Sequence, residues 1–443
     1  MSLAKLSLAT VTAILAVGPP GCAQPDGVVG ERYRPVLISD LAPIAALDVL
    51  FVIDDSASMA DDQAALIAAA HDHLFPELAA QAGGMPDLHL GVISTDLGNG
   101  GGPSLPGCVG AGDDGALLIG PACTGIGDRY LRDAPAGDGT RVRNYPGTLD
   151  DAFGCVAALG PTGCGFEQPL AALRRALDPS NLANQGFLRP EALLLVVIVS
   201  DEDDCSVTDA ALFGAPDATV TSPLGPRTSF RCFEFGVTCA EPEDRAVGAR
   251  TACTPRTDSP YVSALAPLVD AVIAAKGGDR GKVMVTGIFG DDQPVAVVLE
   301  DNGGGPTFPA LAVQCTVDTA VTAYPAVRLQ AFAREFPGRF LLPGVCASGM
   351  AQTVARIGAA VRDVLAGGTC LLGEPRLPLD CQARAIAAGG ATRMLPVCAG
   401  AGCVTVAPSA TCAATDHHLQ AVIAPGLVVP GETVEVDCAV AQP

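Results

Sequence analysis

The sequence has no tryptophan and few aromatic residues of any kind. Phenylalanine, tyrosine and tryptophan together make up 4% of its 443 residues. Single-stranded nucleic acids are held by stacking on aromatic side chains, so a stacking platform for bases or sugars is not expected here. Basic residues are also scarce, 26 against 48 acidic ones, which gives a formal net charge of −22. Such a chain repels nucleic acid and anionic lipid and suits divalent cations.

Three motifs of hydrolases and phosphate-binding enzymes are absent as well. The sequence contains no Gly-x-Ser-x-Gly, no His-Glu-x-x-His and no phosphate-binding loop of the Gly-x4-Gly-Lys-Ser/Thr type. We therefore expect a binding protein and not an enzyme.

The N-terminus has the features of an export signal. Lys5 precedes a short apolar run, 6–17, which has the length of the hydrophobic part of a signal peptide and is too short to span a bilayer. Cys22 follows a small residue at the distance typical of a bacterial lipobox, although two prolines stand where such signals prefer leucine and a small residue. We expect 1–22 to be a signal with lipidation at Cys22, which anchors the protein to a membrane. The alternative is ordinary secretion.

The number of cysteines agrees with lipidation. Without Cys22, sixteen of the 17 cysteines remain, and an even number can pair completely as eight disulfides. Disulfides persist in the compartments that exported proteins reach. Nearness in sequence suggests the pairs Cys155–Cys164 and Cys232–Cys239.

The chain is organised around one apolar run, 49–53. Its length and valine and isoleucine content suit a central strand of a parallel sheet, buried on both faces. The run ends in Asp54-x-Ser56-x-Ser58, at the carboxyl end of the strand, where ligands bind in open α/β sheets. A carboxylate and two hydroxyls at alternate positions of a tight turn can converge on Mg²⁺ or Ca²⁺. The alternative is a capping turn, in which one serine N-caps the following helix.

The rest of the chain alternates apolar runs with helical spacing, which predicts a doubly wound, mostly parallel α/β sheet. Further strands are expected at 88–94, 193–199, 283–289 and 340–342, and helices at 60–82, 150–159, before 177, 261–275, 326–336 and 347–365.

Four segments flank or interrupt this pattern. Residues 23–45 have no periodicity and indicate a linker to a domain over 46–368. Segments rich in glycine, proline and cysteine at about 97–148 and 206–258 indicate long insertions, the first with an edge strand near 117–119. Residues 369–443 hold six cysteines and short β-like runs, typical of a small disulfide-stapled β module. The spacing Cys398-x4-Cys403 leaves a metal knuckle as an alternative.

A second acidic loop follows the strand at 193–199. Ser200-Asp201 comes directly after it, and Asp201 would bind the ion through water, as Asp54 would. Four acids in a row, 201–204, repel one another unless a cation or solvent intervenes, so Asp203 is a further candidate ligand. The alternative is a solvated acidic turn.

These loops resemble the metal-ion-dependent adhesion site of von Willebrand factor A (vWA) domains. That family has Asp-x-Ser-x-Ser after its first strand, Thr-Asp or Ser-Asp in its third loop, and Gly-Gly-Thr-x-Thr-Gly-x-Ala-Leu in its second. Here 165–173 aligns with the second loop, and Glu167 falls on the position of the ligand threonine. The resemblance implies Glu167 as a ligand, with Thr162 as the alternative if the loop is longer. A carboxylate there makes the ion a weaker Lewis acid and favours Ca²⁺ or a fully satisfied Mg²⁺. Glu167 can also be read as a helix N-terminal acid.

Over 46–368 the pattern is similar to vWA-domain lipoproteins of myxobacteria and related bacteria, on the segments 163–168, 200–205 and 230–239. The resemblance implies an outer-membrane lipoprotein of the cell envelope that binds, through its ion, a protein ligand offering a carboxylate. The alternatives are a metal-dependent hydrolase built on Asp54, Asp201 and Asp203, and a structural envelope protein with a closed metal site.

Overall fold

The computed structural model describes residues 33–38, 44–81, 83–120, 123–242, 245–301, 307–317, 321–336, 340–341, 344–371, 378–387, 391–409, 412, 418–429 and 432–439. The predicted signal and Cys22 lie outside these residues. Among the described helices, none is long and apolar enough to cross a bilayer.

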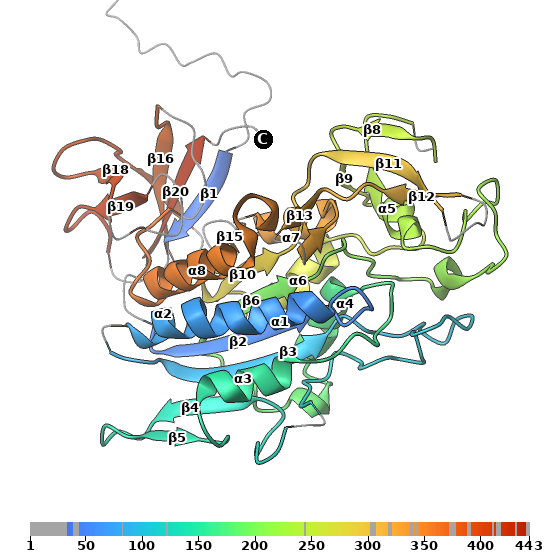
Figure 1. Ribbon diagram of the computed structural model, residues 1–443. Coiled ribbons are helices and arrows are strands. Elements are labelled where there is room, and N and C mark those ends of the chain that lie inside the picture. The colour runs from blue at the N-terminus through green and yellow to red at the C-terminus, as the bar shows by residue number, and fades with distance from the viewer. Residues whose placement is uncertain are drawn as a thin grey trace, which may run out of the picture.

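A seven-stranded sheet forms the centre of the molecule, in the order β15-β10-β6-β2-β3-β4-β5 (Figure 1). The first five strands of that order are parallel and the last two are antiparallel, which confirms a mixed α/β fold with a mostly parallel sheet. Their bounds are β2 (Ala46–Ile53), β3 (Asp87–Ser94), β4 (Leu131–Pro135), β5 (Arg141–Arg143), β6 (Leu193–Val199), β10 (Val283–Ile288) and β15 (Phe340–Leu341).

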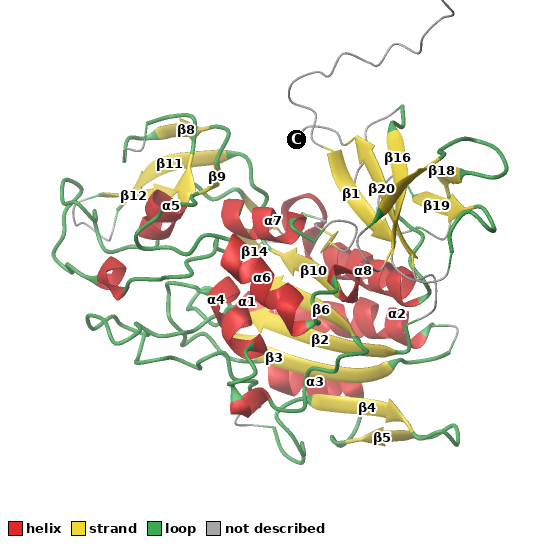
Figure 2. Cartoon of the chain, turned by 180° about the vertical axis from the view of Figure 1, so that it is seen from behind, coloured by secondary structure: helices red, strands yellow, loops and turns green. Residues whose placement is uncertain are grey.

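Helices cover both faces of this sheet (Figures 1 and 2). Alternate residues of β2 enter two separate cores: Val49 and Phe51 pack on one face, and Leu50 and Val52 on the other. This is the two-sided burial expected of a central parallel strand. The first core is completed by α1 (Ala60–Ala69), a π-helical turn (Ala70–Leu74), α2 (Phe75–Ala79), α3 (Leu149–Ala157) and α8 (Val345–Leu365), and the second by α4 (Pro169–Leu177), α6 (Ala266–Ala275) and α7 (Val327–Arg334).

Strand register brings the loops after β2 and β6 together. Ile53 pairs with Val199, the last residue of each strand. Beyond that pair, Asp54 N donates to Val199 O at 2.9 Å, and Ser200 N donates to Ile288 O of β10 at 3.2 Å. Three neighbouring strands therefore end at one edge, where the chain also reverses direction across the sheet.

The two insertions fold differently from the sequence prediction. One edge of the sheet is formed by the β4–β5 hairpin. The prediction of an edge strand near 117–119 is wrong, because this segment is joined to β3 by a single backbone hydrogen bond, from Leu118 N to Val92 O at 2.8 Å. The second insertion recruits a later segment, because its strand β8 pairs with β11. Its elements are a 3-10 turn (Ala210–Phe213), α5 (Phe230–Gly236), β7 (Val237–Thr238), β8 (Gly248–Arg250) and β9 (Thr254–Pro255). The later segment supplies β11 (Val295–Glu300) and β12 (Phe308–Leu311).

The remaining short elements are connectors. They are 3-10 turns at Leu182–Asn184 and Arg280–Lys282, and a hairpin of β13 (Cys315–Val317) and β14 (Val321–Ala323).

A C-terminal β module lies at the opposite end of the molecule from the β8–β11–β12 sheet (Figures 1 and 2). It consists of a four-stranded sheet, β1-β20-β16-β17, and a β18–β19 hairpin. Reading all of 23–45 as a linker is wrong, because 33–38 forms β1. This strand pairs antiparallel with 434–439 of β20 and so covers an otherwise free strand edge. The bounds are β1 (Tyr33–Ile38), β16 (Cys381–Ala387), β17 (Thr392–Leu395), β18 (Val404–Pro408), β19 (Leu419–Ile423) and β20 (Glu432–Ala439).

All sixteen cysteines after Cys22 are paired, which confirms the expectation of eight disulfides. Both suggested pairs are wrong, because folding brings cysteines together from different loops. The bonds are Cys108–Cys164, Cys123–Cys155, Cys205–Cys232, Cys239–Cys253, Cys315–Cys346, Cys370–Cys412, Cys381–Cys438 and Cys398–Cys403. The Cys398–Cys403 disulfide excludes a metal knuckle at these two cysteines.

Candidate metal centre

Asp54 is the fixed point of the centre. It is fully buried, and its Oδ1 accepts a hydrogen bond from Ser56 N at 2.8 Å while its Oδ2 accepts one from Ser200 Oγ at 2.7 Å. Gln63, on α1, donates to the main-chain oxygen of Asp54 at 3.0 Å. The loops after β2 and β6 therefore hold this carboxylate, and α1 holds the main chain of Asp54.

The two hydroxyls of the first loop lie side by side. Ser56 Oγ and Ser58 Oγ are 3.2 Å apart. Adjacent ligands at right angles around an ion are separated by roughly 3.0 Å for Mg²⁺ and roughly 3.4 Å for Ca²⁺, given their usual bond lengths. The two hydroxyls form a hydrogen bond with each other, and its length also matches the spacing of neighbouring ligands of either ion. The capping-turn alternative is wrong, because the N-cap of α1 is Met59 and no side chain caps it.

Asp201 supplies an oxygen without a partner. The residue is 6% exposed, and its Oδ1 is buried with no hydrogen bond. Ser58 bonds the same carboxyl group, which counters the increase in its pKa caused by burial. Buried carboxylate oxygens are rarely left unpaired, so Asp201 Oδ1 lacks a partner that an ion or a water could supply.

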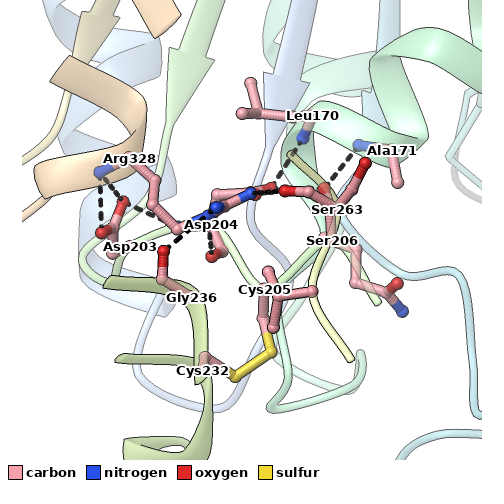
Figure 3. Close-up of polar contacts among 12 residues, drawn as sticks. Leu170, Ala171, Asp203, Asp204, Cys205, Ser206, Cys232, Gly236, Ser263 and Arg328 are labelled. Atoms are coloured by element: carbon pink, nitrogen blue, oxygen red, sulfur yellow. Dashed lines mark hydrogen bonds and ion pairs between the residues drawn. A yellow bond between two sulfur atoms is a disulfide. The ribbon is translucent and has the colours of Figure 1, made fainter. Parts of the chain in front are cut away.

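Glu167 comes from the loop before α4 and reaches the same space. It is 3% exposed, and burial, then the charges of Glu202, Asp54 and Asp201, raises its pKa well above the usual value. The N–H groups of the first turn of α4 donate to Asp204 Oδ1 and Ser206 Oγ (Figure 3). Glu167 is therefore not the acid that caps the N-terminus of this helix.

Thr162, the alternative to Glu167, does not share this burial. It is exposed on the preceding loop. The fold thus brings together Asp54, Ser56, Ser58, Glu167 and Asp201, and leaves Thr162 at the surface.

Negative charge accumulates at the centre without basic partners. Burial first, and neighbouring carboxylates second, raises the pKa of Asp54 to about 6, of Asp62 to about 7 and of Glu202 to about 8. Within the described part of the chain, no ion pair involves these three residues, Glu167 or Asp201. A bound divalent cation would compensate this charge and lower the same pKa values.

Asp203 is a helix cap. Its two oxygens accept from Arg328 N at 2.9 Å and Leu329 N at 3.0 Å, in the first turn of α7 (Figure 3). Burial raises its pKa to about 6, and the bond from the Arg328 N–H opposes that increase. These hydrogen bonds give Asp203 a role as the cap of α7, and its role as a further ligand stays a prediction.

Asp204 forms a buried ion pair that sequence reasoning missed. Its Oδ2 lies 2.9 Å from Nη2 of Arg328, and both side chains are almost completely buried (Figure 3). Its Oδ1 accepts from Leu170 N at 3.1 Å and from Ser206 Oγ at 2.6 Å. The negative charge of 201–204 is therefore compensated in part by the guanidinium of Arg328, 124 residues further along the chain. The only sequence signal for this pair was a basic residue in the first turn of α7.

One group of three potential ligand atoms lies elsewhere. Asp363, Cys370 and Cys412 place such atoms within 4.8 Å of one another, but the two cysteines form a disulfide and Asp363 Oδ2 accepts from Cys370 N at 3.1 Å. In the described residues no other three carboxylate, histidine or cysteine atoms converge as closely. At the candidate centre the hydroxyls of Ser56 and Ser58 would bind an ion directly and Asp54 and Asp201 would bind it through water, while Glu167 is the candidate for a direct carboxylate.

Comparison with known proteins gives little further information. No family profile and no curated protein sequence matches this chain. Among solved structures, the pilus adhesin SpaC from Lactobacillus rhamnosus GG, in its open conformation, is similar over 91% of the chain with a TM-score of 0.32 and 8% identity. The human COPII-coat protein Sec24c is similar over 90% with a TM-score of 0.31 and 10% identity. The chain spans 40% of the length of each. Likenesses this weak carry no argument.

Proposed function

We propose that this protein is a cell-envelope binding protein that holds one divalent cation and, through it, a carboxylate of a protein ligand. The observation that carries the proposal is Asp201 Oδ1, a buried oxygen without a partner beside two hydroxyls at the spacing of metal ligands. Anchoring through a lipid on Cys22 belongs to the same proposal and rests on the sequence.

The residues present fit a hard cation. Ser56 and Ser58 would bind it directly, Asp54 and Asp201 through water, and Glu167 would add a carboxylate. The charge of Glu167 favours Ca²⁺ over an open, strongly electrophilic Mg²⁺. The ion would supply a positive charge to which a ligand carboxylate can coordinate, in a protein that otherwise repels acidic groups.

The vWA assignment of 46–368 belongs to this proposal. It is supported by two motif loops at the adjacent ends of β2 and β6, and by the loop between α3 and α4, where Glu167 O accepts from Cys205 N. The reversal of strand order at β2 and the helices on both faces of the sheet also support it.

The hydrolase alternative is weaker, because one of its three carboxylates, Asp203, is occupied as a helix cap. The following experiment distinguishes a closed structural site from a site that binds a protein ligand. The mature protein on beads should retain an envelope protein in Ca²⁺ and release it with a chelator. Asp54→Ala should abolish retention. Asp72→Asn, which changes an exposed acid on the π-helical turn after α1, should not. Equal retention by Asp54→Ala would exclude binding through the ion.

A further inference from the structure

A pocket of about 110 Å³ opens beside the candidate metal centre. On the same measure one water needs roughly 10–15 Å³, so the pocket has room for the end of one long side chain. Glu202, the neighbour of Asp201, forms one wall, and α5, β12 and Tyr324 form the others. These elements gather at one corner of the molecule (Figure 1).

Aromatic rings line this pocket in a chain that has few of them. Phe230, Phe233, Phe308 and Tyr324 all contribute, although aromatic residues make up 4% of the sequence. The rings of Phe230 and Phe233 lie 5.8 Å apart. Aromatic faces attract cations, arginine most often among protein side chains.

The ionisable groups around the pocket are all acidic. Glu300 is exposed at β11 and Glu202 lies at the inner wall, and no basic residue is among the described lining residues. Asp203 also lines the pocket, but its carboxylate oxygens accept hydrogen bonds from N–H groups in the first turn of α7. Thr228 Oγ1 is buried in the wall without a hydrogen-bond partner, which leaves an acceptor for an N–H group.

The pocket and the metal centre share a wall. Tyr324 N donates to the main-chain oxygen of Asp201 at 2.8 Å, and Glu202 lies against the carboxyl group of Glu167. A ligand whose carboxylate reached the ion would therefore place a neighbouring side chain at the pocket.

We propose that this pocket binds a basic side chain, arginine before lysine, of the protein ligand whose carboxylate the ion holds. The inference rests on the proposed function. A guanidinium stacks flat on aromatic rings and gives two parallel N–H bonds to a carboxylate, which an ammonium group cannot do. The protein would thus recognise a ligand that carries one acidic and one basic side chain close together.

A single-tryptophan reporter tests the pocket without knowledge of the ligand. The chain has no tryptophan, so Tyr324→Trp gives a signal from the pocket alone. Butylguanidinium should change its fluorescence at lower concentration than 1-pentanol or pentanoate do. Glu300→Gln should weaken butylguanidinium about two- to fivefold, the range for one exposed ion pair. Phe308→Trp serves as the reporter if Tyr324→Trp does not fold.

The same titration separates this inference from the proposed function. Butylguanidinium should bind in the presence of a chelator and in an Asp54→Ala background, because the pocket has its own walls. Equal affinities for butylguanidinium and pentanol, or no effect of Glu300→Gln, would overturn the pocket assignment. Neither result would affect Ca²⁺ binding at the centre, which is measured separately.

Discussion

Glu167 is the residue at which the candidate centre differs from the vWA pattern. If its carboxylate belongs to the shell, Glu167→Thr should weaken Ca²⁺ binding about tenfold, or ~1.4 kcal/mol. The loss follows because one negative ligand is replaced by a neutral hydroxyl. Calcium titration of the mature protein measures the change, and Thr162→Ala, on the exposed neighbouring loop, should bind like wild type. Coincident curves for wild type and Glu167→Thr would place Glu167 outside the shell.

The raised pKa values of three acids at the candidate centre predict a pH dependence of stability. Asp54, Asp62 and Glu202 have folded pKa values of about 6, 7 and 8, above their ordinary values. The folded protein therefore binds more protons than the unfolded one between about pH 4 and 8, and its stability falls as the pH rises through that window.

Calcium should remove this dependence, because the ion stabilises the ionised carboxylates. The rise in melting temperature produced by Ca²⁺ should be larger at pH 8 than at pH 5. Melting curves with chelator and with Ca²⁺ at both pH values measure it. A metal-free protein that became more stable towards pH 8 would contradict the assignment of these acids.

The sequence predicted the residues of the first and third loops because each follows an uninterrupted apolar strand. Asp54 and Asp201 could be placed at one sheet edge from that pattern alone. The roles of Asp203 and Asp204 could not be predicted, since their partner Arg328 lies on another helix far along the chain. Acidity alone does not distinguish a metal ligand from a cap or an ion pair.

At the scale of elements, the ion pair of Asp204 and Arg328 joins the acidic loop to α4 and α7. Arg328→Met should destabilise the protein by about 3–5 kcal/mol, because it leaves a buried carboxylate without its cation. Urea unfolding measures the change. Arg393→Met, which removes an exposed pair with Glu432, is the control and should have little effect. Equal midpoints for Arg328→Met and wild type would show that the pair does not hold these elements.

Prediction of elements succeeded where a local pattern determines the structure. The strand expected at 193–199 is β6, Leu193–Val199, because seven apolar residues leave no other arrangement in a buried sheet. It failed where pairing is distant. Strand β8 pairs with β11, and β1 with β20 at the other end of the chain, and neither partner is recognisable from its neighbours in sequence.

At the scale of the whole molecule, the eight disulfides account for every cysteine except Cys22. All sixteen others are consumed by disulfides within the described residues, as the count of 17 requires if Cys22 carries a lipid. Cys22→Ser should therefore release the protein from the membrane fraction of the producing cell. Fractionation followed by immunodetection measures it, and a variant that stays with membranes would show that anchoring does not use Cys22.

The net charge of −22 and the buried, uncompensated acids make ion binding the central claim. Calorimetric titration of the chelator-treated mature protein with CaCl₂ tests it most directly, with Asp201→Asn as the matched variant and Asp72→Asn as the control. We predict one Ca²⁺ per chain for wild type and Asp72→Asn, and strongly weakened binding for Asp201→Asn. No bound ion in the wild type, or undiminished binding in a folded Asp201→Asn variant, would contradict the metal centre.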